Sequence, residues 1–342
     1  MFSLLFLCSF GLLQGQTTVI NPVVPAKEIT VAQDGSGDFT TIQAAINAVR
    51  DLGQWRVKIF IKKGTYHEKL VIPSWKTKIS LIGEDKQQTV ITNNDYSGKI
   101  NPGGKDAFGN DKFSTYTSYT VLVQGDDTVM ENLTIKNNAG RVGQAVVLHV
   151  EGDRFVCSNC RLMGNQDTLY AATAGSRQYY TKCDIEGTTD FIFGEATAVF
   201  QGCTIKSLAD SYITAAATSP RQDFGFVLSG CNLIAANGVN KVFLGRPWRG
   251  YAKTVYLNCV LGSHILPEGW NPWKGDAMFK EKEKTAYYAE YNSSGNGADT
   301  NNRVSWSKQL SAKAAKQYTL KKILGGTDSW NPLIDLLNYN YK

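Results

Sequence analysis

Five cysteines recur in one column when short segments of the sequence are aligned, and this repeat limits the possible folds more than any other feature. The segments "SNCRLMG", "TKCDIEG", "QGCTIKS", "SGCNLIA" and "LNCVLGS" place in one column Cys160, Cys183, Cys203, Cys231 and Cys259. The upstream segment "MENLTIKN" fits the same frame with Leu133 in the cysteine position. Intervals of 20 to 28 residues are too short for a βαβ unit and match one coil of a parallel β-helix.

Such a column predicts an interior ladder, because equivalent residues of neighbouring coils stack about 4.8 Å apart. The cysteines would act as small buried hydrophobic residues, and a disulfide between adjacent coils stays open as an alternative. Cys157 and Cys160 form one CxxC pair, but no second pair or histidine cluster completes a tetrahedral zinc site. His67, His149 and His264 are scattered, so we expect each to be structural.

The ends of the chain predict helices that cover the solenoid. In "TTIQAAINAVRDLG", Thr40 and Gln43 have the spacing of a capping box, and one helical face carries Ile42, Ala45, Ile46, Val49 and Leu52. Near the other end, "SKQLSAKAAKQY" and "PLIDLLNY" predict helices that pack back along the coils. The polar stretch from Asp95 to Ser114 reads as an inserted loop that could edge a cleft. Because such helices would cover the unpaired strand edges at the ends of the solenoid, we expect a monomer.

Composition predicts a globular protein, and the apolar N-terminal run predicts that it is exported. The 342 residues are 42% hydrophobic and 19% charged, which allows a large core. The formal charge of +6 favours a polyanionic partner, and both nucleic acid and acidic polysaccharide fit it. The apolar start "MFSLLFLCSFGLLQG" is too short to span a bilayer and predicts a signal peptide over residues 1–18, although no Lys or Arg precedes it. We expect residues 19–342 to form one secreted or periplasmic domain without a membrane span.

The repeat also places two aspartates side by side. Asp167 lies seven residues after Cys160, and Asp190 lies seven residues after Cys183, so one coil of 23 residues separates them. Their backbones should lie roughly 5 Å apart on one face of the solenoid. Two such carboxyl groups cannot both ionise freely, so one can be a protonated acid while the other stays charged. Turn-forming aspartates at the corners of a solenoid would show the same spacing, so spacing alone leaves a structural role open.

Other polar residues converge on this pair. Gln144 precedes an apolar strand in the preceding coil and Gln166 adjoins Asp167; side-chain amides suit a developing oxyanion, at roughly 3 to 4 kcal/mol for a well-placed donor. The segment "VFLGRPWRGY" offers Arg246, which could hold the second aspartate ionised, and Trp248, on which a sugar ring could stack. No G-x-S-x-G elbow occurs, which argues against an ordinary serine esterase. No P-loop or HExxH motif occurs either.

Four ordered segments, "GQAVVL", "GNQDTLY", "GTTDFIFG" and "LGRPW", resemble the signature segments of pectin methylesterases. Further similar segments include "DGSGDFTTIQAAINAV", "KKGTYHEKL" and "ILPEGW", and the similarity runs from about Glu28 to about Trp330. The resemblance implies an all-β chain folded as a right-handed parallel β-helix, with an N-terminal capping helix and C-terminal helical segments. It also implies hydrolysis of galacturonosyl methyl esters in pectin, with release of methanol and pectate.

Residue by residue, the resemblance implies that Asp190 is the nucleophile that forms an acyl-enzyme and that Asp167 is the general acid and base. Gln144 and Gln166 would form the oxyanion hole, and Arg246 would orient the nucleophile. Substrate contacts are expected from Trp248, Tyr170, Phe191 and Tyr251. The scheme requires no metal and no cofactor, and its partner is methyl-esterified homogalacturonan rather than nucleic acid.

Several other functions stay open on sequence alone. A β-helical pectin lyase would give unsaturated products and need calcium, whereas a polygalacturonase would generate reducing ends. An esterase or thioesterase of the same fold would act on another acyl group. A non-catalytic polysaccharide-binding solenoid would bind without hydrolysis, and its binding would survive replacement of Asp190.

Overall fold

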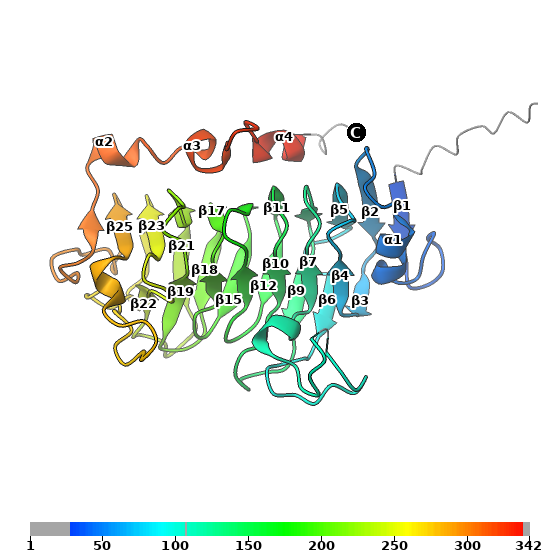
Figure 1. Cartoon of the computed structure of the whole chain (residues 1–342), viewed down its shortest axis with the longest axis horizontal. Helices are drawn as coiled ribbons and strands as arrows, with labels where there is room; N and C mark the ends of the chain where they lie inside the picture. Colours follow the sequence, from blue (N-terminus) through cyan, green and yellow to red (C-terminus); the bar gives the residue numbers. More distant parts are fainter. Residues whose placement is uncertain (1–27, 107, 338–342) are drawn as a thin grey trace, which may run out of the picture.

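Three parallel β-sheets run along an elongated solenoid and enclose a single long core (Figure 1). The computed structural model describes residues 28–106 and 108–337, so the predicted signal peptide at residues 1–18 lies outside the described residues. Each complete coil contributes one strand to each sheet, and the strands within a sheet pair in parallel. The coil is right-handed, as crossovers between parallel strands of one sheet almost always are. The predicted right-handed parallel β-helix is therefore confirmed.

The three sheets are named A, B and C in the order in which one coil visits them. Sheet A comprises β1 (Glu28–Val31), β2 (Val57–Ile61), β5 (Ile79–Gly83), β8 (Val129–Glu131), β11 (Phe155–Ser158), β14 (Arg177–Thr181), β17 (Thr197–Gln201), β20 (Phe226–Ser229), β23 (Lys253–Leu257), β25 (Tyr287–Tyr291) and β26 (Lys308–Gln309). Sheet B comprises β3 (Gly64–His67), β6 (Thr89–Asn93), β9 (Thr134–Asn137), β12 (Arg161–Met163), β15 (Asp184–Gly187), β18 (Thr204–Ser207), β21 (Asn232–Ala235) and β24 (Val260–Leu261). Sheet C comprises β4 (Leu70–Ile72), β7 (Val121–Val123), β10 (Leu148–Val150), β13 (Leu169–Ala171), β16 (Ile192–Gly194), β19 (Tyr212–Ala216) and β22 (Phe243–Gly245).

The cysteine column lies at the bend between sheets A and B. Arg161 N donates to Leu133 O, and Asp184 N donates to Cys160 O, both at 2.9 Å, so Leu133 occupies the column as predicted. The same bond repeats in the following coils. The five column cysteines are at most 1% exposed and are free thiols. They act as an interior hydrophobic ladder and form no disulfide.

A left-handed backbone conformation forms this bend in each coil. The residue before each column position has φ between 48° and 61°, and these residues are Asn132, Asn159, Lys182, Gly202, Gly230 and Asn258. Glycine and asparagine tolerate this conformation best, so five of the six carry little strain. The bend turns the chain sharply between two strands without breaking the interior column.

The N-terminal helix α1 (Ile42–Ala48) packs at the end of the solenoid beside β1 (Figure 1). Its N-cap is Thr41 rather than the predicted Thr40, and Gln43 uses its side-chain oxygen to accept from Val71 N at 2.8 Å. The Glu68 carboxylate accepts from the first backbone N–H groups of the helix instead. Leu52 is 71% exposed, because the helix ends before it and it does not continue the buried face.

Three short helices follow the last strands and lie along the outer face of sheet A: α2 (Ala312–Ala315), α3 (Leu320–Leu324) and α4 (Pro332–Leu337) (Figure 1). Ile323 and Leu324 pack into a cluster with valines of that face, such as Val156. Arg177 forms a bidentate ion pair with Asp328, which ties this segment to β14. The predicted packing of the C-terminal helices along the coils is confirmed.

Two long loops project from the same side of the solenoid in Figure 1. One connects β6 to β7 and carries the 3-10 helix η1 (Thr115–Thr117), and the other follows β24 and carries η2 (Lys282–Lys284). No helix within the described residues is both long and apolar enough to cross a membrane. Both loops border the face of sheet C where the candidate site lies.

We expect the six described cysteines to be unreactive toward a thiol reagent in the folded protein, because burial denies the reagent access. All six should react after unfolding in denaturant without a reductant. Thiol titration with and without denaturant measures this. Two thiols missing after unfolding would contradict the free ladder, and Cys157 with Cys183 would be the first pair to examine, because their sulfur atoms lie 3.8 Å apart.

Candidate active site

The structure places Asp167 and Asp190 at equivalent positions of adjacent coils, just before β13 and β16. The register pairs Leu169 with Ile192 and so aligns the two aspartates. Asp167 N donates to Thr189 O at 3.1 Å, within the connection between the coils. The two aspartates are 8% and 6% exposed. The predicted side-by-side arrangement of these residues is confirmed.

Both aspartates have a left-handed backbone, with φ of 64° at Asp167 and 48° at Asp190. This conformation is uncommon for residues other than glycine, although aspartate adopts it more readily than most. The turn directs both side chains away from the core into a cavity of about 240 Å³ on the outer face of sheet C. Strained backbone at two equivalent positions that share one cavity is typical of a functional site.

Arg246 binds Asp190 through both carboxylate oxygens. Arg246 Nε lies 2.9 Å from Asp190 Oδ1, and Arg246 Nη2 lies 2.6 Å from Oδ2. The guanidinium is held between two aromatic rings, with its central carbon 3.9 Å from the ring centre of Tyr212 and 3.5 Å from that of Trp273. Cation–π contacts on both faces fix the plane of the guanidinium and so the orientation of the carboxylate.

The two aspartates differ in their proton affinity because only one has a cationic partner. Burial, followed by the negative charge of Asp190, raises the pKa of Asp167 well above its usual value. Burial also raises the pKa of Asp190, but the hydrogen bonds and charge of Arg246 oppose this shift. Asp167 is therefore the protonated member of the pair, and Asp190 is the member that ionises first.

Gln144 and Gln166 lie beside the carboxyl pair on adjacent coils. Their backbones form a parallel bridge, and both side chains line the cavity of the aspartates. Neither side-chain amide has a hydrogen-bond partner among the described residues. Their N–H groups are thus available to an oxygen atom of a bound molecule.

Comparison with known proteins places this site in a family. Residues 28–327 match the family model described as Pectinesterase. The chain belongs to the pectinesterase family. It is 38% identical to "Pectinesterase 2" of Citrus sinensis over 90% of this chain and 59% of that protein. The structure is similar to pectin methylesterase from carrot, with 30% identity, a TM-score of 0.80 and coverage of 96% of this chain and 99% of the other.

A second structural relative is a pectin methylesterase in complex with a hexasaccharide, at 29% identity and a TM-score of 0.77, with 89% of this chain and 98% of the other covered. The chain spans about half the length of several curated relatives of the family that it matches. Those longer proteins are named as pectinesterases with pectinesterase inhibitors. The shared region is thus the β-helix of a pectinesterase.

Six of the residues that the resemblance assigned to a pectinesterase site surround one cavity. They are Gln144, Gln166, Asp167, Asp190, Arg246 and Trp248. Tyr170 lines the neighbouring cavity and stacks on Phe193 with ring centres 4.5 Å apart. Among the described residues, no three His, Cys, Asp or Glu side chains gather in a way that would hold a metal ion.

Two of the predicted substrate contacts line neither the cavity of the aspartates nor the neighbouring one. Phe191 is fully buried in the main core and packs over Gly187, so the prediction that it contacts substrate is wrong. The left-handed turn at Asp190 sends the next side chain inward, and the outward position falls two residues later at Phe193. Tyr251 is 48% exposed and does not line the cavity of the aspartates.

Sequence reasoning missed several residues of the site. Phe193 lies one coil after Tyr170 in the same register, so the 23-residue spacing could have found it. Tyr116 comes from the loop between β6 and β7, and Trp273 comes from the loop after β24. The repeat gives no register for these loops, so it could not place either residue.

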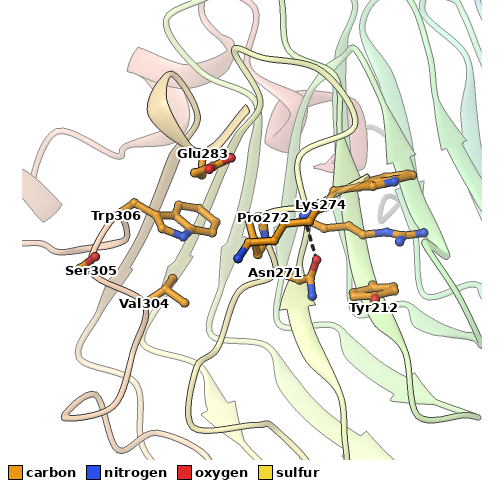
Figure 2. Close-up of a pocket in the computed structure, with 10 residues that line it drawn as sticks. Tyr212, Asn271, Pro272, Lys274, Glu283, Val304, Ser305 and Trp306 are labelled. Atoms are coloured by element: carbon orange, nitrogen blue, oxygen red, sulfur yellow. Dashed lines mark hydrogen bonds between the residues drawn. The ribbon is translucent and has the colours of Figure 1, made fainter. Parts of the chain in front are cut away.

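The cavity of the aspartates is the centre of a longer cleft. Arg246 and Trp273 also line a cavity of about 710 Å³, and Figure 2 shows Trp306 and Tyr212 at opposite sides of it with Lys274 between them. Tyr116 also lines a third cavity of about 590 Å³ toward the N-terminal coils. Shared residues connect the three cavities, which is an arrangement suited to an extended chain.

We expect Asp167→Asn to raise the free energy of unfolding at neutral pH. The pKa of Asp167 is higher in the folded than in the unfolded protein, so the wild type loses stability as pH rises between those two values, by about 1.4 kcal/mol per pKa unit. The gain from the variant should shrink below about pH 4, where the carboxyl is protonated in both states. Urea unfolding across pH measures it, with Asp184→Asn on sheet B as control. A variant no more stable than wild type at neutral pH would contradict this account.

Proposed function

We propose that this chain hydrolyses galacturonosyl methyl esters in pectin, releasing methanol and pectate through an acyl-enzyme on Asp190. The observation that carries the proposal is the asymmetric carboxyl pair: Asp190 is held by Arg246, and Asp167 beside it has a raised pKa. One carboxylate can act as a nucleophile while the other donates a proton, which is the division that ester hydrolysis by two carboxyl groups needs. Membership of the pectinesterase family supports the substrate class.

Acylation begins with attack on the ester carbonyl carbon. A carboxylate oxygen of Asp190 forms the new bond, and the carbonyl oxygen takes up the negative charge. The amides of Gln144 and Gln166 face the cavity without partners and donate to this oxyanion. The bond to the methoxy oxygen then breaks, and Asp167 gives its proton to the departing methanol. The product is an anhydride between Asp190 and the galacturonosyl carboxyl group.

Deacylation reverses the role of Asp167. Now ionised, it takes a proton from a water molecule that attacks the galacturonosyl carbonyl carbon, and the same two amides stabilise the second oxyanion. The bond to Asp190 breaks, which regenerates its carboxylate beside Arg246 and leaves a galacturonic acid unit, whose carboxyl group then releases its proton to solvent. Asp167 is protonated again at the end, so the pair returns to its starting state without an external proton donor.

The partner in this proposal is a methyl-esterified homogalacturonan chain. The linked cavities offer room for several sugar units, and Trp248 beside the aspartates provides a flat apolar surface for one of them. The formal charge of +6 suits a product that becomes more anionic with each turnover. We also propose that the protein acts as a monomer outside the cytoplasm, secreted or periplasmic, and that it requires no cofactor.

Methanol release from highly methylated pectin tests the assigned roles. We expect Asp190→Asn and Asp167→Asn to abolish nearly all release, because each removes a group that takes part in bond making or proton transfer. Gln144→Ala or Gln166→Ala should lower kcat by about 10²- to 10³-fold. Asp184→Asn, a surface residue paired with Lys86, is the matched control.

Robust release by either aspartate variant would contradict these roles. Unsaturated products or new reducing ends from the wild type would indicate a lyase or a polygalacturonase. Binding of pectin without any hydrolysis would indicate a non-catalytic solenoid, and release from a thioester substrate alone would indicate another acyl specificity.

The pH profile of kcat/KM should be bell-shaped. Activity rises with pH as Asp190 ionises, and it falls as Asp167 loses its proton at higher pH. Arg246→Lys keeps a positive charge but loses the bidentate contact, so the pKa of Asp190 should increase and the rising limb should move to higher pH. A rising limb that stays in place in this variant would show that another group controls it.

A further inference from the structure

The loop that supplies Trp273 carries a buried cation next to that ring. Lys282 begins the 3-10 helix η2, shortly before β25, and its side chain is 1% exposed. Its Nζ lies 4.4 Å from the centre of the Trp273 ring, and the central guanidinium carbon of Arg246 lies 3.5 Å from the same centre. At these distances the two cations cannot share one face of the ring, so the indole lies between them.

An ion pair within the loop holds Lys282 in this place. Its Nζ lies 2.7 Å from Asp276 Oδ2, and Asp276 Oδ1 accepts from the backbone N–H groups of Met278 and Phe279 at 3.0 and 3.2 Å. The backbone oxygen of Lys282 accepts from Ala286 N at 2.9 Å, directly before β25. The ion pair therefore ties the turn of the loop to the segment that enters sheet A.

Burial is unfavourable for the charge of Lys282. It lowers the pKa of this side chain, and the ion pair with Asp276 opposes that shift. The positive charges of Arg249 and Arg246 lower the pKa further. Apolar side chains of similar volume can often replace a buried ion pair without loss of stability. Stability of the loop alone thus gives no reason for a buried lysine at this position, whereas its contact with Trp273 does.

We propose that Lys282 and Asp276 are positioning residues for the reaction and that they act through Trp273. They hold its ring against the guanidinium of Arg246, and this guanidinium binds the carboxylate of Asp190. The inference rests on the proposed function, because it concerns the groups that keep the nucleophile ionised and oriented. Lys282 does not line the cavity of the aspartates or either neighbouring cavity, so it acts without touching the substrate.

The charge of Lys282 also acts on the nucleophile directly. Arg246 has the larger effect, but the positive charge of Lys282 lowers the pKa of Asp190 as well. Asp167 and Tyr288 interact with the same carboxylate; the first is the protonated member of the pair, and burial keeps the second neutral by raising its pKa. Loss of the lysine charge should therefore raise the pKa of Asp190 and move the rising limb of the pH profile to higher pH.

Steady-state kinetics on highly methylated pectin across pH test the inference. Lys282→Met keeps the length of the side chain and removes its charge. We expect this variant to lower kcat by about 10- to 100-fold with little change in KM, because a displacement of about 1 Å in a catalytic group can cost this much. The rising limb should move to higher pH. Asp276→Asn, at a more exposed position, should change kcat in the same direction by a smaller factor.

Lys284→Met is the matched control, since Lys284 lies on the same 3-10 helix but is exposed and pairs with Glu281 at 2.6 Å. It should match the wild type in kcat, KM and pH profile. Urea unfolding shows that each variant is folded before its kinetics are compared. A wild-type kcat and an unmoved rising limb in both Lys282→Met and Asp276→Asn would overturn the inference.

A double-mutant cycle shows whether Lys282 acts through Trp273. In protein that already carries Trp273→Ala, we expect Lys282→Met to change kcat on the pH plateau by less than about twofold, because the ring that transmits its effect is absent. A loss in this background as large as the loss in the wild-type background would overturn the inference.

A direct titration of Asp190 separates this inference from the proposed function. In protein labelled with carbon-13 at the aspartate carboxyl groups, the NMR signal of Asp190 is assigned by its absence from Asp190→Asn. We expect this signal to titrate at higher pH in Lys282→Met than in the wild type and in Lys284→Met. If the wild type releases no methanol, the proposed function fails, yet this titration still decides the role of Lys282. Identical titrations in Lys282→Met and the wild type would overturn the inference.

Discussion

The hydrogen-bond ladder between successive coils is the constraint on which the rest of the structure depends. Parallel strands in neighbouring coils must lie about 4.8 Å apart to form it, so any two residues at equivalent positions are forced into contact distance. The chain uses this once for packing, in the column of buried cysteines, and once for chemistry, in the pair Asp167 and Asp190. Two carboxyl groups that would repel each other if both were ionised are held together by backbone hydrogen bonds elsewhere in the coil.

Residues with a left-handed backbone conformation form the bends between the sheets and explain why the aspartates face outward. At the bend between sheets A and B, glycine and asparagine mostly occupy the left-handed position. At the bend before sheet C, Asp167 and Asp190 occupy it, and their carboxyl groups enter a cavity instead of serving as turn formers alone. Sequence spacing left open a structural role for the two aspartates, and both residues do form a turn. The same turn also places their carboxyl groups in the cavity.

The repeat predicted the positions of residues that keep a fixed spacing from the cysteine column, and few others. It gave the coil, the interior cysteines, the aspartate pair and the adjacent glutamines, because each follows from counting residues along one coil. The expectation for Phe191 came with the resemblance and not from the repeat, and it is wrong because the bend at Asp190 shifts the alternation of inward and outward side chains. The repeat could not place Trp273, whose long loop has no equivalent in the neighbouring coils. Loop residues that complete a site over a regular scaffold need the three-dimensional structure.

The aromatic clamp on Arg246 turns two chemically identical residues into different acids. A mobile arginine could divide its charge between the two carboxylates and lower the pKa of both. Tyr212 and Trp273 hold the guanidinium in one plane, where both of its hydrogen bonds go to Asp190. Asp167 then receives only a weak stabilisation from the same cation and the full effect of burial and of its charged neighbour. The difference between nucleophile and proton donor in the proposed mechanism thus originates in Arg246 and the two rings that hold it, rather than in the aspartates themselves.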